Sequence, residues 1–313
     1  MDAAGGVGGN WYDLAVPLIL LVIMISMGME LALSDFKRVL EVPRATAVGL
    51  VGQMLVLPAA GLAFAHWPGL SPEIAIGIVI ITACPGGATS NVFSYLARAN
   101  IALSITLTSL SSVLCFATIP LWINLGLSLF ADATDPAGAA LGLPVAATAV
   151  KLLVVTLLPV TIGMGIRAAW PAFSERVRTP LRRSMALLMA LSVLIIVASE
   201  WQQVVGDLES AAGAALVLVS GMLGVAYALA RIARLGERDA FTISIEVGLQ
   251  NGALATLIVL SLLGRPELIV FPGAYAVLSF LPVSVWTLAM RRRVGGGAPP
   301  ADAAERYASS SMP

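Results

Sequence analysis

The sequence predicts an all-α integral membrane protein, and its composition and apolar pattern both support this class. Of the 313 residues, 58% are hydrophobic and only 12% are charged. An ordinary soluble domain has about 25% charged residues. The apolar residues gather in stretches of about 20, long enough to cross the hydrocarbon core of a bilayer as helices.

Nine apolar stretches qualify as transmembrane helices and divide the chain into two halves. We expect an extracytoplasmic segment over 1–13, four helices over 14–129 and five helices over 142–290. Residues 294–313 are rich in Gly, Pro, Ala and Ser and are expected to form a disordered cytoplasmic tail. The nine stretches cover about 14–33, 45–65, 73–97, 100–129, 142–168, 182–203, 210–231, 240–263 and 268–290.

The basic residues predict the orientation in the membrane. All Lys and Arg residues except Lys151 and Arg265 lie after the odd-numbered stretches or in the tail. Cytoplasmic loops carry an excess of Lys and Arg. The N-terminus is therefore expected outside and the C-terminus in the cytoplasm of a multi-pass protein of the cell membrane.

The composition excludes several classes of function. Because 18 basic residues balance 18 acidic ones, no basic excess is available for nucleic acid. The two cysteines, Cys84 and Cys115, lie in apolar stretches, which excludes a disulfide framework. An intramembrane hydrolase needs a nucleophile with a base or paired carboxylates, whereas Glu246 has no second carboxylate at mid-membrane. We therefore expect no enzyme, while a receptor or scaffold stays open.

Two of the nine stretches carry helix breakers and polar residues at mid-span. One contains the segment CPGGATSN at 84–91, where Pro85 removes a backbone donor. The other contains EVGLQN at 246–251, followed by Gly252. Broken backbone at this depth must face protein, water or a ligand, because lipid cannot satisfy it. A carboxylate such as Glu246 at mid-membrane indicates a functional site.

The two broken stretches occupy corresponding positions in the two halves, each second from the end of its half and running in opposite directions. Paired interrupted helices in inverted halves are typical of the binding site of a secondary transporter. Gln53, Ser104 and Thr108 are expected to converge on the same place. For Ser111 and Ser112 we expect bonds to their own helix backbone.

With these two motifs, the chain resembles the bile acid:sodium symporter family. Met27-Gly28-Met29, Pro72-Glu73-Ile74-Ala75 and Pro272-Gly273-Ala274 contribute to a resemblance that covers nearly all of 14–290. It implies a bacterial inner-membrane protein with nine helices, core and panel domains, two crossing broken helices and alternating access.

The resemblance also implies two sodium sites behind the crossing, because every matching position offers an oxygen. The residues matching the first site are Ser90, Asn91, Ser104, Thr108 and Glu246. Those matching the second are Gln53, Gln250 and Glu246, with the main-chain carbonyls of Val247 and Leu249. The residues expected to contact substrate are Thr89, Asn251 and Ser279.

Together these expectations favour sodium-coupled import of an organic anion such as a bile acid or a small carboxylate. The half-helix N-termini after each break present positive dipole ends to an anion. The alternative is a metalloid or proton-coupled exporter of related fold, using Cys84 and Glu246. Besides the anion and the lipid bilayer, we expect no nucleic acid and no obligate protein partner.

Overall fold

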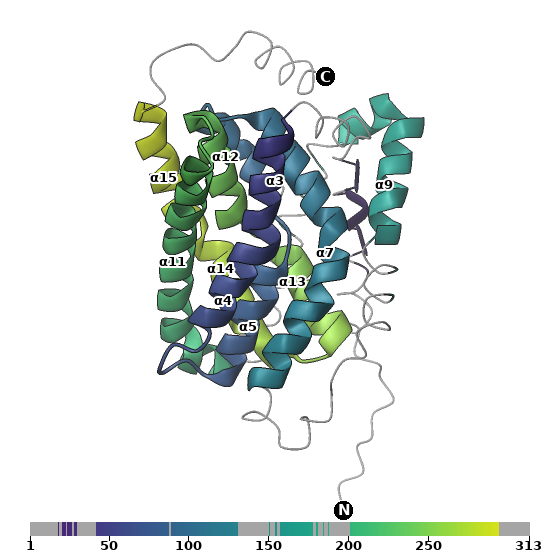
Figure 1. Cartoon of the computed structure of the whole chain (residues 1–313). Helices are drawn as coiled ribbons and strands as arrows, with labels where there is room; N and C mark the ends of the chain where they lie inside the picture. The colour runs from purple at the N-terminus through teal and green to yellow at the C-terminus, as the bar shows by residue number, and fades with distance from the viewer. Residues whose placement is uncertain are drawn as a thin grey trace, which may run out of the picture.

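The computed structural model describes residues 42–87, 89–130, 157–177 and 201–293, with scattered positions between 18 and 29 and between 150 and 187 (Figure 1). The described secondary structure is helical apart from one isolated β-bridge between Gly86 and Gln250. The predicted all-α class is therefore confirmed.

The described residues between 42 and 177 form helices separated by short irregular segments or by residues outside the description. The elements are α3 (Pro43–Val51), the π-helix η2 (Gly52–Val56), α4 (Leu57–Phe64), α5 (Pro72–Ala83), α6 (Thr89–Leu96), α7 (Ile101–Phe130) and α9 (Leu158–Ala169). Residues 171–177 form a further helical turn after Trp170.

The described residues 201–293 begin with a long helix and again contain one broken helix. Its elements are α11 (Trp201–Ile232), α12 (Glu237–Gly248), α13 (Gly252–Leu257), the π-helix η6 (Ile258–Leu263), the 3-10 helix η7 (Pro266–Ile269), α14 (Val270–Leu278) and α15 (Phe280–Arg293).

Within the described residues, three continuous helical spans are long and apolar enough to cross a bilayer, namely Pro43–Phe64, Leu208–Ile232 and Pro266–Arg291. A fourth is α7, which bends by 62° between Cys115 and Ala117. Pro120 follows this bend, and a proline lacks the N–H that would bond the carbonyl four residues earlier. Most of the predicted helices 14–33 and 182–203, and about half of 142–168, lie outside the described residues, so the number nine stays a prediction.

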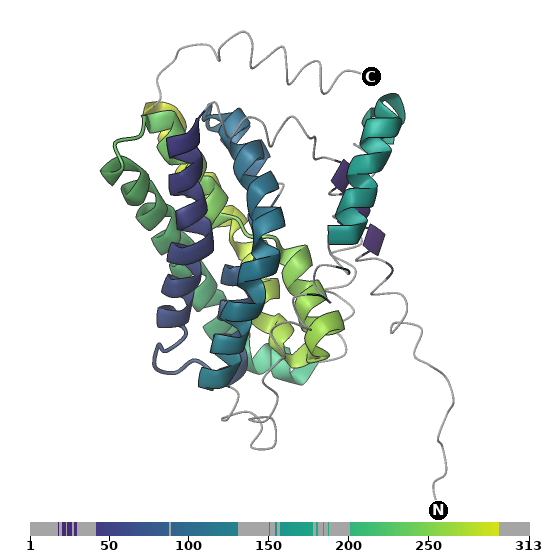
Figure 2. The same cartoon turned by 45° about the vertical axis from the view of Figure 1, so that its right-hand side comes forward.

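Both broken helices lie at the centre of the described helices. Every residue from Ile74 to Ala83 of α5, from Ala240 to Gly248 of α12 and from Gly252 to Leu257 of α13 is buried. α11, α3 and α7 surround them, whereas α9 lies apart on the side away from α11 (Figures 1 and 2). The outer helices expose apolar side chains such as Val217 and Leu288, each 60% exposed, as helices facing lipid do.

One predicted boundary is wrong. We expected a loop between the stretches 182–203 and 210–231, but α11 is helical without interruption from Trp201. The charged residues Asp207 and Glu209 lie between these two apolar stretches, yet both are compatible with a helix, whose backbone bonds are made within the segment.

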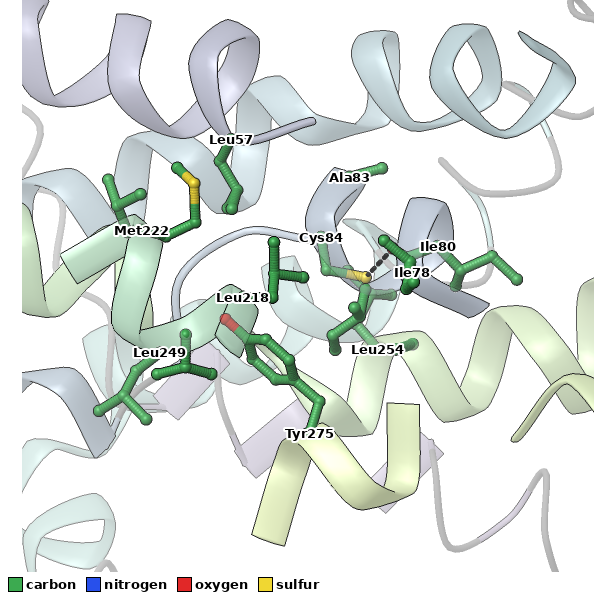
Figure 3. Close-up of a cluster of buried hydrophobic side chains, with 14 of the residues drawn as sticks. Leu57, Ile78, Ile80, Ala83, Cys84, Leu218, Met222, Leu249, Leu254 and Tyr275 are labelled. Carbon is green, nitrogen blue, oxygen red and sulfur yellow. Dashed lines mark hydrogen bonds between the residues drawn. The ribbon is translucent and has the colours of Figure 1, made fainter. Parts of the chain in front are cut away.

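An apolar cluster packs around the break between α5 and α6. Figure 3 shows Cys84 surrounded by side chains of α4, α5, α11, α13 and α14, including Leu57, Ala83, Leu218, Leu254 and Tyr275. The Cys84 thiol donates to the Ile80 carbonyl at 3.3 Å. The Tyr275 hydroxyl donates to the Gly248 carbonyl at 3.1 Å, so α14 is bonded to the end of α12.

Candidate functional site

The two broken helices meet at their breaks. α5 ends at Ala83 and α12 ends at Gly248, and the residues that follow each, Cys84 and Leu249, have extended backbone. The Gly87 N–H donates to the Leu249 carbonyl at 2.8 Å, and the Asn251 N–H donates to the Pro85 carbonyl at 2.9 Å. Each break thus supplies partners for backbone groups that the other break leaves free. The predicted breaks, and their meeting, are confirmed.

Two glycines allow this close approach. A Cβ atom built on Gly86 would overlap the Oε1 atom of Glu246. A Cβ on Gly87 would lie 3.1 Å from the Gln250 carbonyl oxygen. The Pro-Gly-Gly sequence therefore does more than interrupt a helix, because it lets one strand-like segment touch both the carboxylate and the opposite break.

A buried carboxylate lies beside the crossing with three hydroxyl partners. Ser90 Oγ donates to Glu246 Oε2 at 2.6 Å and Ser104 Oγ donates to the same atom at 3.0 Å. Thr108 Oγ1 donates to Glu246 Oε1. All four side chains are at most 2% exposed. Ser104 and Thr108 are one turn apart on α7, so they present both hydroxyls to α12.

Asn91 supplies an oxygen that has no partner in the described part of the chain. Its Oδ1 atom is buried and accepts no hydrogen bond there. Asn91 follows Ser90 on α6, next to the residue that bonds Glu246. A carboxylate, three hydroxyls and an orphan amide oxygen are the donor set that a hard cation prefers. The residues predicted for the first sodium site therefore fit such an ion, and four of the five are joined by hydrogen bonds.

Of the residues predicted for the second site, Gln53 and Gln250 form an amide cluster at the break, and no described hydrogen bond joins Glu246 to it. Gln53 Nε2 donates to the Cys84 carbonyl at 3.0 Å and to Gln250 Oε1 at 2.6 Å. Gln250 Nε2 donates to the Val247 carbonyl at 2.6 Å. The Leu249 carbonyl accepts the Gly87 N–H, as described above. Gln53 Oε1 is buried without a partner among the described residues, which again fits a cation.

The three residues predicted to contact substrate are not equally placed. Thr89 is exposed at the start of α6. Asn251 is 7% exposed and its Oδ1 accepts the Leu254 N–H at 3.0 Å, so its side chain caps α13. Ser279 is 2% exposed between α14 and α15, where its N–H and carbonyl bond within the helix. Asn251 lies in the crossing, where its N–H donates to the Pro85 carbonyl, whereas the described hydrogen bonds do not join Ser279 to it.

Of the two serines expected to bond their own helix, one does so. Ser111 Oγ donates to the Thr108 carbonyl at 3.2 Å. Ser112 Oγ is buried without a partner in the described chain, so that expectation is wrong for Ser112. The Thr108 carbonyl, four residues before Ser112, already accepts the Ser111 hydroxyl.

Sequence reasoning missed a second polar contact between α7 and α12. Asn100 Nδ2 donates to Asp239 Oδ1 at 2.8 Å, and the Asn100 N–H donates to Thr242 Oγ1 at 2.9 Å. Asn100 and Thr242 each lie four residues before a residue of the carboxylate cluster, namely Ser104 and Glu246. The spacing of four residues from Asn100 to Ser104, and from Thr242 to Glu246, could have indicated this contact. It places the two members of each pair on the same side of their helix.

These features define a multi-pass helical membrane protein whose central broken helices cross beside a buried carboxylate. The family model described as the sodium bile acid symporter family matches residues 17–207. The chain belongs to this family.

Curated relatives agree with the family. The chain is 32% identical over 262 residues to the "Probable sodium/metabolite cotransporter BASS2, chloroplastic" of Oryza sativa subsp. japonica, covering 82% of this chain and 58% of the relative. It is 28% identical to the "Uncharacterized sodium-dependent transporter YocS" of Bacillus subtilis (strain 168), covering 78% and 73%. It is 26% identical to the human "Ileal sodium/bile acid cotransporter", covering 83% and 74%.

The chain thus spans less than two thirds of the rice protein's own length. The names of these relatives describe transport rather than catalysis, so the expectation of a non-enzyme is confirmed at the level of the family.

Proposed function

We propose that the protein is a secondary active transporter that couples the inward movement of an organic anion to sodium. The observation that carries this proposal is the Glu246 cluster, in which three hydroxyls from α6 and α7 surround a buried carboxylate. A buried carboxylate costs several kcal/mol unless it is paired. A monovalent cation bound here is the natural counter-charge.

Two cations are proposed, one at each side of the crossing. The first is held by Ser90, Asn91, Ser104, Thr108 and Glu246. The second is held by Gln53, Gln250 and Glu246 with the Val247 and Leu249 carbonyls. One orphan oxygen belongs to each proposed set, that of Asn91 to the first and that of Gln53 to the second, which supports two ions rather than one. When bound, the ions supply positive charge that the single carboxylate only partly balances.

The proposed substrate is an anion with an apolar body, either a bile acid or a small carboxylate. Two monovalent cations and one carboxylate leave a net positive charge, which attracts an anion. Thr89, exposed at the first turn of α6, and Asn251 on the other side of the bridge are proposed to contact it, with Ser279 as a third candidate. Relatives named as metabolite and bile acid cotransporters support an organic substrate.

The proposed architecture has nine membrane helices in two inverted halves, with the N-terminus outside and the C-terminus in the cytoplasm of the cell membrane. The broken helices α5–α6 and α12–α13, which cross through one pair of backbone bonds, support the inverted arrangement. A Gly5→Cys variant in a background lacking Cys84 and Cys115 tests the orientation. An impermeant thiol reagent should label it on intact cells, and labelling only after membrane disruption would contradict the proposal.

The proposed activity is tested in two stages. The melting temperature of purified protein should rise in NaCl relative to equal KCl, because a ligand that binds only the folded state stabilises it. Uptake into proteoliposomes should then require an inward sodium gradient. Carboxylates of graded size should compete for uptake and their neutral amides should not. Equal stabilisation by potassium would contradict sodium coupling, and equal competition by amides would contradict an anionic substrate.

A further inference from the structure

One helix next to the crossing has an irregular turn that places Gln53. In η2 the hydrogen bond runs over five residues, from the Leu57 N–H to the Gly52 carbonyl. Such π-turns are rare and are frequently found at functional sites. Gln53 is the second residue of this turn, and its amide reaches both breaks, at the Cys84 carbonyl and at Gln250.

Pro58, which directly follows this turn and Leu57, removes one backbone donor. In an α-helix the Met54 carbonyl would accept the N–H of residue 58, but residue 58 is proline and has none. The missing donor comes from another helix, since the Trp122 Nε1–H of α7 donates to the Met54 carbonyl at 3.2 Å. Thr118, one turn earlier on α7, donates from Oγ1 to the Met54 sulfur at 3.7 Å.

The bend in α7 makes these contacts possible. Thr118 and Trp122 follow the 62° bend between Cys115 and Ala117, and Pro120 lies between them. Ser104 and Thr108 precede the bend and face Glu246. A single helix therefore contacts the carboxylate cluster with its first part and supports the amide cluster with its second.

We propose that Trp122 is a positioning residue for the amide cluster, acting through the Met54 carbonyl to hold the π-turn that directs Gln53 at both breaks. This inference rests on the proposed sodium coupling. It assigns Trp122 no contact with sodium or substrate. Its indole N–H bonds the carbonyl to which Pro58 can offer no N–H, and so ties α7 to the turn that carries Gln53.

Trp286 provides a matched control in the same chain. It is also partly buried, and it packs against Tyr227 at a ring-centroid distance of 5.8 Å. In contrast to Trp122, its Nε1 atom has no hydrogen-bond partner among the described residues. Replacing either tryptophan by phenylalanine removes similar apolar area, but only at Trp122 does it remove a hydrogen bond.

The experiment measures the sodium concentration that gives half-maximal thermal stabilisation of the full-length purified protein. We expect Trp122→Phe to raise this concentration about fivefold, the effect of one lost neutral hydrogen bond. Trp286→Phe should leave it unchanged. In a Gln53→Leu background, Trp122→Phe should have no further effect on sodium, because a positioning residue acts only through the group that it places. If Trp122 only stabilised the fold, Trp122→Phe would lower the melting temperature measured without sodium. It would do so by the same amount in the wild type and in the Gln53→Leu background.

If Trp122→Phe does not yield folded protein, benzothienyl-alanine at position 122 keeps the shape of tryptophan and lacks only the N–H. A normal sodium response in this protein, or an effect of Trp122→Phe that persists unchanged without Gln53, overturns the role of Trp122. A wild-type protein that shows no difference between sodium and potassium overturns the proposed function, and this inference with it.

Discussion

The two sides of the crossing hold their polar groups in different ways. Around Glu246, three hydroxyls from regular helical positions bond one charged group. Around Gln53 and Gln250, neutral amides bond main-chain carbonyls that helix breaks have freed. The carboxylate side thus depends on side-chain chemistry at helical spacing, whereas the amide side depends on irregular backbone. In the proposed cation sites, the negative charge therefore comes from the carboxylate side. The arrangement of the oxygens on the amide side comes largely from the helix breaks.

The largest expected effect comes from removing that charge. Glu246→Gln keeps the volume of the side chain but removes the only carboxylate shared by both proposed sites. A unit charge at contact distance contributes about 4 kcal/mol at an effective dielectric constant of 20, so the sodium response should fall by at least about a hundredfold. Melting temperatures in NaCl and KCl provide the measurement. A folded Glu246→Gln protein with the wild-type sodium response would contradict the assignment.

A second variant perturbs both sides through the backbone. Gly86→Ala introduces a Cβ that overlaps Glu246 Oε1 in a segment bonded to the opposite break. Overpacking of this kind costs about 1–3 kcal/mol, so we expect sodium-dependent stabilisation to weaken by between about fivefold and a hundredfold. Gly273→Ala on α14 is the control, because nothing lies within 4 Å of its Cβ position. Equal effects of the two alanines would show that the close approach at Gly86 has no consequence.

A hydroxyl deletion tests the carboxylate side alone. Thr108→Val removes one donor to Glu246, and a hydrogen bond to a charged group contributes about 1.5–3 kcal/mol. The sodium concentration for half-maximal stabilisation should rise about tenfold or more. Thr106→Val is the matched control on the same helix, since Thr106 Oγ1 donates to the Ala102 carbonyl of its own helix. Measured side by side, the two valines should differ, and identical sodium titrations would remove Thr108 from the site.

The smallest effects should separate the two sides. Asn91→Ala and Gln250→Ala each remove a neutral ligand from one proposed site, and each should weaken sodium dependence about fivefold. Because each variant leaves one proposed site intact, uptake should rise less steeply with sodium concentration in both variants than in the wild type. The sodium concentration for half-maximal uptake should differ between the two variants. The measurement is uptake into proteoliposomes over a range of sodium concentrations. Curves for both variants that match the wild type would contradict the division into two sites.

Much of the site was predictable because its residues interrupt an otherwise apolar pattern. Pro85, Glu246 and Gln250 stand out in membrane stretches, and the four-residue spacing of Ser104 and Thr108 places both on one helix face. The structure confirms that these residues meet. Asn100 and Trp122 were not predicted. An asparagine at a helix start and a tryptophan in an apolar helix are ordinary there, and the spacing from Asn100 to Ser104 indicates a contact only once α7 is known to face α12.

The sequence by itself determined the class of the fold, the positions of the two helix breaks and the identity of the buried carboxylate. Each of these follows from local chemistry, since apolar length selects a membrane helix, proline and glycine interrupt it, and a carboxylate at mid-membrane requires partners. Only the tertiary structure decided which groups become those partners. The breaks are joined by hydrogen bonds between residues about 160 positions apart, such as Gly87 with Leu249, and the donor missing at Pro58 is supplied by Trp122 of another helix. Such pairings depend on how helices pack in three dimensions, which no local spacing specifies.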